Sequence, residues 1–433
     1  MTRLFTRAWI VVILLGCPMT ASSDEPDLKQ RVDELEKVVD VLQKRVSERE
    51  QTQLKSDSLR VYWKEGLRLE SADEVFKLRI GGRIMNDWAF VSAHEDLEDA
   101  LGSDLDDGTE FRWARIALEG TIYDRTEFKI EYDFAGSALT DVYLGLIKLP
   151  VIGNIRIGHF KEPFSLEELT SNKFITFMER SSVNVFAPAR NTGLMLYKPA
   201  LNERVTWAAG VFRDTDKFGK DVGDDGYAFT GRVTALPWYE EKGWKLLHIG
   251  AAYSHREANG DTVQFKGKPD ANLAPDFVDT GKFDADQMDL VGAEAALVYG
   301  PASLQAEFVN AMVETPGGSD PSFSAYYVMG SYFLTGEYRP YETATAAFCR
   351  VKPNRNFLAE GGGIGAWEVA ARYAYLDLTD EDVDGGELRT IDAGLNWYLS
   401  PNMRIMWNYT FADADEKYES NANIFQMRFQ VDF

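Results

Sequence analysis

The chain has 433 residues and a formal net charge of −23, and 13% of its residues are Phe, Tyr or Trp. This acidic balance excludes a nucleic-acid-binding protein, because such a protein needs a basic surface. The mean hydropathy is −0.29, and after residue 16 no apolar run approaches the ~18 residues of a membrane-spanning helix. A helical membrane protein is therefore excluded beyond the N-terminus, whereas membrane strands with one apolar face remain allowed.

Residues 1–23 have the pattern of a secretory signal peptide. A start with two arginines precedes a short apolar stretch, and small side chains lead up to Ser23 as a cleavage site. The stretch Leu14–Cys17 also resembles a lipoprotein signal, so cleavage at Ser23 and lipid attachment at Cys17 both stay open. Either signal predicts that the protein leaves the cytoplasm.

Residues 24–60 are predicted to form a coiled coil and a linker in the periplasm. Apolar side chains recur there in heptads and charged residues fill most other positions, which is typical of a coiled-coil helix. The seam residues are Leu28, Val32, Leu35, Val39, Leu42 and Val46. An amphipathic helix packed on its own domain is the alternative, but the narrow apolar seam favours association between chains. Leucine and valine at the seam do not decide between a dimer and a trimer.

From residue 75 to the C-terminal Phe433, apolar and polar residues alternate with the period of two that is typical of β-strands. Sixteen candidate strands follow one another, at 75–91, 109–123, 125–136, 138–149, 152–161, 192–200, 202–214, 225–237, 243–256, 288–300, 302–314, 323–339, 364–378, 387–400, 402–413 and 422–433. Short turns alternate with long polar links. All the long links are expected on the same side of the fold, and they lie at 92–108, 161–191, 214–226, 257–287, 340–363 and 379–386. The sequence therefore predicts an all-β fold over residues 75–433, a sixteen-stranded antiparallel transmembrane β-barrel, preceded by an N-terminal coiled-coil helix.

The predicted inner face of the barrel is charged. In the first strand Arg79, Arg83 and Asp87 point inward between outward apolar residues, and in the third strand Lys129 and Glu131 do the same. Charged side chains that face an interior are costly unless the interior is wet, and sixteen strands form a ring too wide for side chains to fill. We therefore predict a water-filled lumen. A soluble all-β sandwich or propeller is the alternative, but its core would not tolerate these charges.

The link 161–191 differs from the other long links because it carries many apolar residues. Such a segment is expected to fold against the inner wall of the barrel, where it would narrow the pore and form a selectivity filter. Its basic residues are Lys161, Lys173, Arg180 and Arg190, and its glutamates are Glu162, Glu167, Glu168 and Glu179. The link is therefore formally neutral.

Several pieces of the sequence carry a family resemblance. They are Lys161-Glu162-Pro163-Phe164, Thr176-Phe177-Met178-Glu179-Arg180, Pro188-Ala189-Arg190-Asn191-Thr192-Gly193, Phe111-Arg112-Trp113-Ala114-Arg115 and the ending from Gly394 through Phe433. With these pieces, most of residues 75–433 resembles the phosphate-selective porin O and P family, whereas the signal peptide and the heptads lie outside the resemblance. The resemblance implies a trimeric outer-membrane channel whose third external loop folds inward and whose lumen arginines and lysines pass anions.

The candidate pore-lining and anion-binding residues are all basic. They are Arg79, Arg83, Arg115, Lys161, Lys173, Arg180, Arg190, Arg404 and Arg428. The five arginines outside the link 161–191 come from the first two and the last two strands, which become neighbours when the barrel closes, so we expect them to form one basic strip. Opposed by the glutamates of the link, this strip would produce a transverse field, as in general porins. Opposed by the basic residues of the link, it would form an anion site.

The sequence thus predicts an outer-membrane diffusion channel for small anions, with phosphate or polyphosphate as the suspected solute. The alternative is a general or weakly selective porin with a structural role in the cell envelope through its coiled coil. No enzyme, cofactor or metal site is expected, since the four histidines are scattered and no nucleophile motif stands out. The expected partners are small anions, outer-membrane lipid and two further copies of the chain in a homotrimer, and not nucleic acid. Two cysteines, Cys17 and Cys349, cannot form a disulfide framework.

Overall fold

The computed structural model describes residues 25–56, 59–94, 96–98, 105–224, 226–415 and 420–433. It separates into two units, residues 1–58 and residues 59–433. The described part of the first unit is the helix α1 (Glu25–Ser56), which has 32 residues. The predicted signal peptide, residues 1–23, lies outside the described residues.

The apolar seam of α1 is exposed to solvent. Val32, Leu35, Val39, Leu42 and Val46 are between 48% and 63% exposed. The helix itself is confirmed, whereas its association with other copies into a coiled coil stays a prediction. No helix in the described part of the chain is long and apolar enough to cross a membrane.

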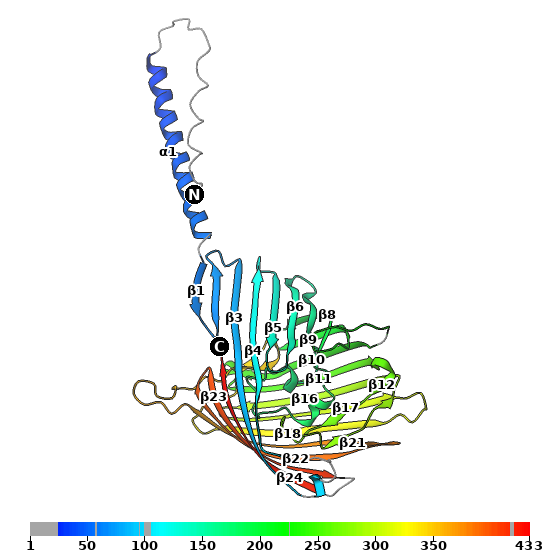
Figure 1. Cartoon of the computed structure of the whole chain (residues 1–433). Coiled ribbons are helices and arrows are strands. Elements are labelled where there is room, and N and C mark those ends of the chain that lie inside the picture. Colours follow the sequence, from blue (N-terminus) through cyan, green and yellow to red (C-terminus); the bar gives the residue numbers. More distant parts are fainter. Residues whose placement is uncertain (1–24, 57–58, 95, 99–104, 225, 416–419) are drawn as a thin grey trace. The chain divides into compact units, whose positions relative to one another are not determined.

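The second unit contains a closed antiparallel β-barrel (Figure 1). Within the described residues its sixteen strands are β3 (Phe76–Ala93), β4 (Gly108–Ile122), β5 (Thr126–Asp133), β6 (Ala138–Leu149), β7 (Gly153–Lys161), β8 (Arg190–Ala200), β9 (Val205–Arg213), β10 (Tyr227–Glu240), β11 (Lys245–Glu257), β16 (Gln287–Tyr299), β17 (Ala302–Glu314), β18 (Ser322–Phe333), β21 (Ala366–Asp380), β22 (Val383–Ser400), β23 (Met403–Asp415) and β24 (Ser420–Asp432). Each strand pairs with the next, and β24 pairs with β3 to close the ring. The predicted fold class is confirmed, although the strand predicted at 323–339 already ends at Phe333.

The closing strand β24 alternates its faces as predicted. Phe425, Phe429 and Val431 point outward and are 40–43% exposed, whereas Arg428 and Gln430 point inward and are at most 3% exposed. These two inward side chains are polar and meet other polar groups of the interior, and the outward positions from Phe425 to Val431 are apolar as in a barrel that faces lipid.

The C-terminal residue completes the seam of the barrel. The amide of Phe433 donates to the carbonyl of Gly82 at 3.0 Å, and the amide of Gly82 donates to the carbonyl of Phe433 at 2.7 Å. A Cβ atom at residue 82 would lie 2.7 Å from the ring of Phe433 and 2.5 Å from the carbonyl oxygen of Arg115. Glycine is therefore the residue that allows this close approach.

A hairpin that was not predicted precedes the barrel. Strand β1 (Leu59–Trp63) pairs with β2 (Leu67–Ser71), and β2 pairs with residues 77–80 of β3. Strand β24 pairs with residues 83–93 of β3, while the other edge of β3 pairs with β4. One edge of β3 therefore holds the hairpin and the closing strand one after the other.

The two ends of the barrel differ in their connections. We call the end where β3 starts and β24 stops the termini end, and the opposite end the loop end. Most of the long connections, including 162–189 and 258–286, lie at the loop end as predicted. The connection 334–365 lies at the termini end, because β18 runs toward that end and β21 leaves it. The expectation that all long links share one side is wrong for this segment.

Three of the long connections fold into the barrel. Their short elements are α3 (Leu166–Leu169) and η1 (Ser182–Val185) in 162–189; η3 (Asn259–Asp261), β12 (Thr262–Val263), β13 (Lys266–Gly267), β14 (Val278–Asp279) and β15 (Phe283–Asp284) in 258–286; and β19 (Tyr341–Glu342) and β20 (Ala347–Phe348) in 334–365. Phe177 and Phe186 of the first connection pack with Phe265 of the second and with inward residues of β16 to β24, such as Phe323 and Ile424, in one buried cluster. That part of the interior is apolar and filled, so the predicted wet, charged interior is limited to the remaining wall.

Candidate functional site

The inserted loop, residues 162–189, is anchored to the wall of β17 by a carboxylate. The two oxygens of Glu307 accept hydrogen bonds from the backbone amides of Leu166 and Glu167 at 2.9 and 2.8 Å. The hydroxyl of Tyr327 donates to the same carboxylate at 2.7 Å. Glu307 thereby satisfies amides at the start of α3 that no helical carbonyl can reach, and it holds this part of the loop against β17.

Two arginines of the last strands hold the following part of the inserted loop. Arg428 pairs with Asp87 of β3 at 2.6 Å and with Glu179 of the loop at 2.8 Å. Arg404 donates to the carbonyl of Ile175 at 2.8 Å. Both arginine side chains are buried, with at most 2% of each residue exposed. They lie beneath the loop, between it and the wall.

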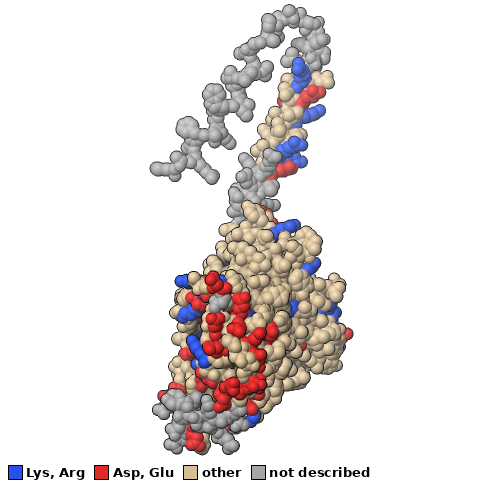
Figure 2. All heavy atoms as spheres, turned by 90° about the vertical axis from the view of Figure 1, so that its right-hand side faces the viewer, with Lys and Arg blue, Asp and Glu red and all other residues tan. Residues whose placement is uncertain are grey.

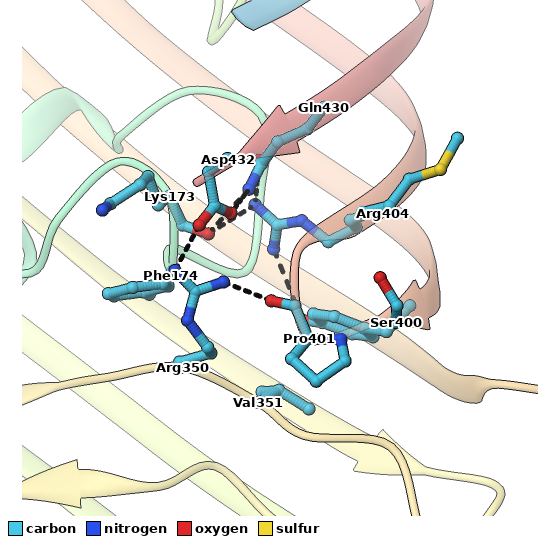
Figure 3. A pocket seen from close by; sticks show the side chains of 11 residues that line it. Lys173, Phe174, Arg350, Val351, Ser400, Pro401, Arg404, Gln430 and Asp432 are labelled. Carbon is cyan, nitrogen blue, oxygen red and sulfur yellow. Dashed lines mark hydrogen bonds and ion pairs between the residues drawn. The ribbon is translucent and has the colours of Figure 1, made fainter. Parts of the chain in front are cut away.

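Figure 3 shows where the closing strand, the inserted loop and the connection 334–365 meet. Asp432 of β24 pairs with Arg350 of the connection, and Arg350 also donates to the carbonyl of Pro401. The carbonyl of Lys173 accepts a hydrogen bond from the side-chain amide of Gln430 at 3.1 Å. The side-chain amine of Lys173 points away from this group in Figure 3, so it is available to the space on the other side of the loop.

The connection 334–365 narrows the barrel from the termini end. The ring of His248 on β11 lies 2.7 Å from the hydroxyl of Tyr341, and Arg232 on β10 donates to the carbonyl of Ala346 at 3.1 Å. Phe348 belongs to the same buried cluster as Leu166 of the inserted loop. Segments from the two ends of the barrel therefore meet inside it, and the open space lies on the side of β3 to β10.

A cavity of about 660 Å³ occupies this space. Of the residues that the structure describes, ten lysines or arginines contribute to its lining: Arg83, Arg112, Arg115, Lys129, Arg156, Lys161, Arg180, Arg190, Lys198 and Arg232. Three acidic residues do so, Asp141, Glu168 and Glu342. A concave surface with this excess of positive charge concentrates small anions from solution.

A smaller cavity of about 190 Å³ lies between the inserted loop and strands β3 to β5. It shares Arg83, Lys129, Ser171 and Phe174 with the larger cavity, so the two are neighbours along one wall. Its charged lining residues are Arg79, Arg83, Lys129, Lys173, Glu119 and Glu131. Positive charge is therefore in excess here as well.

Three of the carboxylates that line the two cavities, Glu131, Asp141 and Glu168, are each shared by more than one cation. The contacts are Arg83–Glu131 at 2.8 Å, Arg115–Glu131 at 3.3 Å, Lys129–Glu131 at 3.7 Å, Lys129–Asp141 at 2.5 Å, Arg190–Asp141 at 2.8 Å, Lys161–Glu168 at 2.9 Å and Arg180–Glu168 at 3.2 Å. Burial raises the pKa of Glu168, but Arg180 and Lys161 outweigh burial and hold that pKa below its usual value. Glu168 therefore stays ionised. The three shared carboxylates position six cations between them, so positive charge remains to attract a ligand.

Lys173 is the loop cation with the greatest freedom to meet a solute. Its amine lies 5.3 Å from the centre of the Phe174 ring and, among the described residues, meets no carboxylate within ion-pair distance. Burial and the nearby charge of Arg83 lower its pKa to about 7, although Asp432 opposes this shift. The charge of Lys173 therefore changes near neutral pH.

The structure divides the nine predicted site residues into three groups. Five line the larger cavity: Arg83, Arg115, Lys161, Arg180 and Arg190. Arg79 and Lys173 line the smaller cavity, and Arg404 and Arg428 lie beneath the inserted loop. The expected single basic strip is thus split, because the loop covers its last two arginines.

The site also contains residues that the sequence reasoning did not select. Lys129 and Asp141 form one ion pair at the centre of the charged wall. The guanidinium of Arg156 lies 4.0 Å from the ring centre of Tyr143 and pairs with Glu127 at 3.0 Å. The alternation of apolar and polar residues in β5 does predict that Lys129 points inward. The sequence does not show which inward residues border a cavity and which are covered by the connections that fill the other part of the barrel.

The negative net charge of the chain lies largely away from these cavities. Figure 2 shows acidic side chains gathered on one face of the molecule. Exposed acidic residues in the loop-end connections include Asp216, Asp224, Asp284, Asp286, Asp320, Glu381 and Asp382. An acidic composition is therefore compatible with a basic interior, since the two charges occupy different parts of the barrel.

Comparisons with known proteins agree with this architecture. A family model described as "Phosphate-selective porin O and P" matches residues 79–433. The chain is similar to Porin O of Pseudomonas aeruginosa, with 26% identity over 403 residues that cover 83% of this chain and 88% of that protein. It is also similar to a protein of Caulobacter vibrioides described only as uncharacterized, with 29% identity over 86% of this chain and 77% of that protein.

Solved structures share the fold at low identity. The anion-selective porin from Comamonas acidovorans has a TM-score of 0.54 and 14% identity, and the match covers 83% of this chain and 100% of that one. The trimer form of OmpT from Vibrio cholerae has a TM-score of 0.50 and 12% identity, with 83% and 100% coverage. At these identities the likeness concerns the barrel alone.

Proposed function

The chain belongs to the phosphate-selective porin O and P family, and from this membership we propose that it is an outer-membrane porin that passes small anions, phosphate among them, along its basic cavities. The family is one of channels and not of enzymes. The observation that carries the proposal is the lining of the larger cavity, with ten basic and three acidic residues among those described. Such a wall attracts anions and repels cations over the short distances that a narrow pore imposes.

The shared carboxylates support a role in binding as well as in conduction. A cation that has a carboxylate of its own is neutralised and attracts an anion only weakly. Asp141 is shared by two cations and Glu131 by three, and Lys129 is one of the partners of each. The positive charge around them is therefore only partly compensated. Guanidinium and ammonium groups that are held in place in this way can donate to an oxyanion without first losing side-chain freedom. We assign the predicted residues that line the cavities, Arg83, Lys161 and Lys173 foremost, to contact with the anion.

The proposal extends to orientation and assembly. The termini end faces the periplasm, since the chain reaches the barrel from an exported N-terminus and an even strand number returns it to the same side. The exposed heptads of α1 support a periplasmic coiled coil that joins copies of the chain. One of the solved structures with this fold is a trimer form, and a homotrimer is the assembly we propose.

A weakly selective porin is the second candidate. The acidic side chains in the loop-end connections favour it, because negative charge at the mouth of a channel lowers the local concentration of anions. A structural role of α1 in the cell envelope would be an addition to either channel function. The two candidates differ in selectivity, which can be measured directly.

Conductance measurements on the purified full-length protein in planar bilayers distinguish the anion-selective porin from the weakly selective one. In a potassium chloride gradient the reversal potential is expected to show preference for chloride, and phosphate added to the bath is expected to reduce the chloride current by occupying the basic wall. Arg83→Gln and Lys161→Gln should weaken this block, whereas Lys64→Gln, which changes an exposed lysine in the turn of the β1–β2 hairpin, should leave it unchanged. A cation-selective reversal potential would refute the anion preference, and protein that does not conduct would refute the channel itself.

A further inference from the structure

The last part of the connection 334–365 lies on the outside of the barrel. The ring of Phe357 packs edge-to-face on Trp397, with ring centres 4.8 Å apart. The indole N–H groups of Trp397 and Trp367 both donate to the carbonyl of Ile364, at 2.8 and 3.2 Å. In Figure 1 the orange loop that projects beside β23 is this segment, residues 354–365.

The two tryptophans point away from the lumen. They are register partners on β21 and β22, and their inward neighbours Glu368 and Asn396 are completely buried. Val369, on the same face of β21 as Trp367, is 37% exposed. Residues 354–365 therefore cover outward-facing tryptophans at the termini end, although the preceding residues of the connection enter the lumen.

Glycine allows this loop to lie close to the wall. Gly365 has a φ of 72°, and a Cβ atom there would lie 2.3 Å from the carbonyl oxygen of Tyr398 and 3.0 Å from the indole nitrogen of Trp397. The apolar side chains that the loop does not use for packing face outward. Leu358 is 79% exposed and Ile364 is 63% exposed, which is unusual for a loop that is fixed by three contacts to aromatic side chains.

This apolar surface is continuous with the outer face of the barrel. The ring of Trp367 is stacked on those of Trp397 and Trp407, with ring centres 5.0 and 6.4 Å apart, so three neighbouring strands carry a row of tryptophans. Aromatic girdles mark the level at which an outer-membrane barrel crosses the boundary between lipid and water. A loop backbone would remain unsatisfied in the hydrocarbon core. The loop therefore belongs at the depth of the headgroups.

We propose that residues 354–365 are a lipid anchor, in which Leu358 and Ile364 insert among the headgroups of phospholipids at the termini end. In the orientation proposed above this is the periplasmic leaflet of the outer membrane. The guanidinium of Arg355 donates to the carbonyl of Gly361 at 2.9 Å and to that of Glu360 at 3.4 Å, which keeps the loop closed while its apolar tips face outward. The partner is a phospholipid surface, because the patch continues the lipid-facing surface of the same strands.

A fluorescent label tests this placement in the full-length barrel. Leu358→Cys in a Cys349→Ser background is labelled with a polarity-sensitive dye, and the protein is inserted into phosphatidylcholine vesicles. The matched control is Ala72→Cys in the same background, at an exposed turn of the termini end. The label at residue 358 should lose emission to a nitroxide on the lipid headgroup or upper acyl chain and should be protected from iodide in water. The label at residue 72 should show the reverse.

Each other outcome overturns the proposal. Quenching of the residue 358 label by iodide would mean that the loop stays in water. Protection from both quenchers, with energy transfer between labels on different copies, would mean that a second copy of the chain covers the patch. Stronger quenching by a nitroxide deep in the acyl chain would mean that the segment lies in the hydrocarbon core. The chloride conductance of both labelled proteins shows independently that the barrel has folded.

Discussion

The guanidinium group of Arg428 lies 2.8 Å from the carboxylate of Glu179, so the last strand of the barrel holds the inserted loop. The same guanidinium contacts Asp87 of the first barrel strand at 2.6 Å. Burial raises the pKa of Glu179, but Arg112 and Arg428 outweigh burial and lower it to about 2. One arginine therefore stabilises both the seam of the barrel and the position of the loop that borders the pore.

Arg428→Met is expected to destabilise the barrel strongly. The variant leaves Asp87 without its ion-pair partner, and breaking a buried pair by removing one partner costs about 3–5 kcal/mol. The free energy of unfolding can be measured in urea with the protein in bilayers. Arg125→Met, at an exposed position in the turn between β4 and β5, is the control and should change that free energy little. An unchanged value for Arg428→Met would show that the contact with Glu179 and Asp87 contributes nothing to stability.

Glu307→Ala is expected to release the start of the inserted loop without opening the barrel. The amides of Leu166 and Glu167 lose their acceptor, and a buried amide without a partner costs about 1–3 kcal/mol. We expect larger and noisier single-channel currents and faster proteolysis within residues 162–189. Glu314→Ala, at an exposed position of the same strand, is the matched control. Equal current noise in the two variants would show that Glu307 does not hold the loop.

The strands of this barrel could be predicted from the sequence because each one repeats the same local rule. The alternation of Phe425, Phe429 and Val431 with Arg428 and Gln430 identifies both faces of β24 without knowledge of any other segment. The β1–β2 hairpin carries the same alternation in Leu59–Trp63 and was missed only because it is short. Local pattern therefore determines most of this fold.

The site could be predicted only in part, because it depends on contacts between distant segments. Arg83 and Arg428 look alike in the sequence, as inward arginines on neighbouring strands. In the structure Arg83 lines both cavities, whereas Arg428 lies beneath the inserted loop. The difference depends on the positions of two loop residues, because Asn172 contacts Arg83 and Glu179 contacts Arg428. In the sequence, the connection 334–365 has the composition of a polar loop like the others. Its local sequence pattern does not indicate that half of it enters the lumen from the termini end.

Cys349 is expected to react faster with an anionic thiol reagent than with a cationic one. This residue lines the larger cavity, so the charge of that cavity decides which reagent reaches it. Burial raises the pKa of its thiol to about 11, which slows both reactions by lowering the fraction of thiolate. The ratio of the rates for a negatively and a positively charged methanethiosulfonate is therefore the informative quantity. Cys349→Ser should abolish both reactions, and a faster reaction with the cationic reagent would contradict a basic cavity.

The anion preference is expected to weaken as the pH rises through 7, because of Lys173. Burial and the nearby Arg83 lower the pKa of this lysine to about 7. Its ammonium group is therefore charged below that pH and neutral above it, so that the smaller cavity loses one positive charge on going from about pH 6 to about pH 8. Reversal potentials in a potassium chloride gradient measure the effect. Chloride is the better probe, because phosphate groups themselves titrate near this range.

Two variants isolate the contribution of Lys173 to this pH dependence. Lys173→Gln should show, at both pH values, the weaker chloride preference that the unaltered protein shows at high pH. Lys173→Arg should keep the stronger preference at both, because a guanidinium stays charged throughout the range. An undiminished pH dependence in Lys173→Gln would have to come from another titratable group, and it would contradict the assignment of this effect to Lys173.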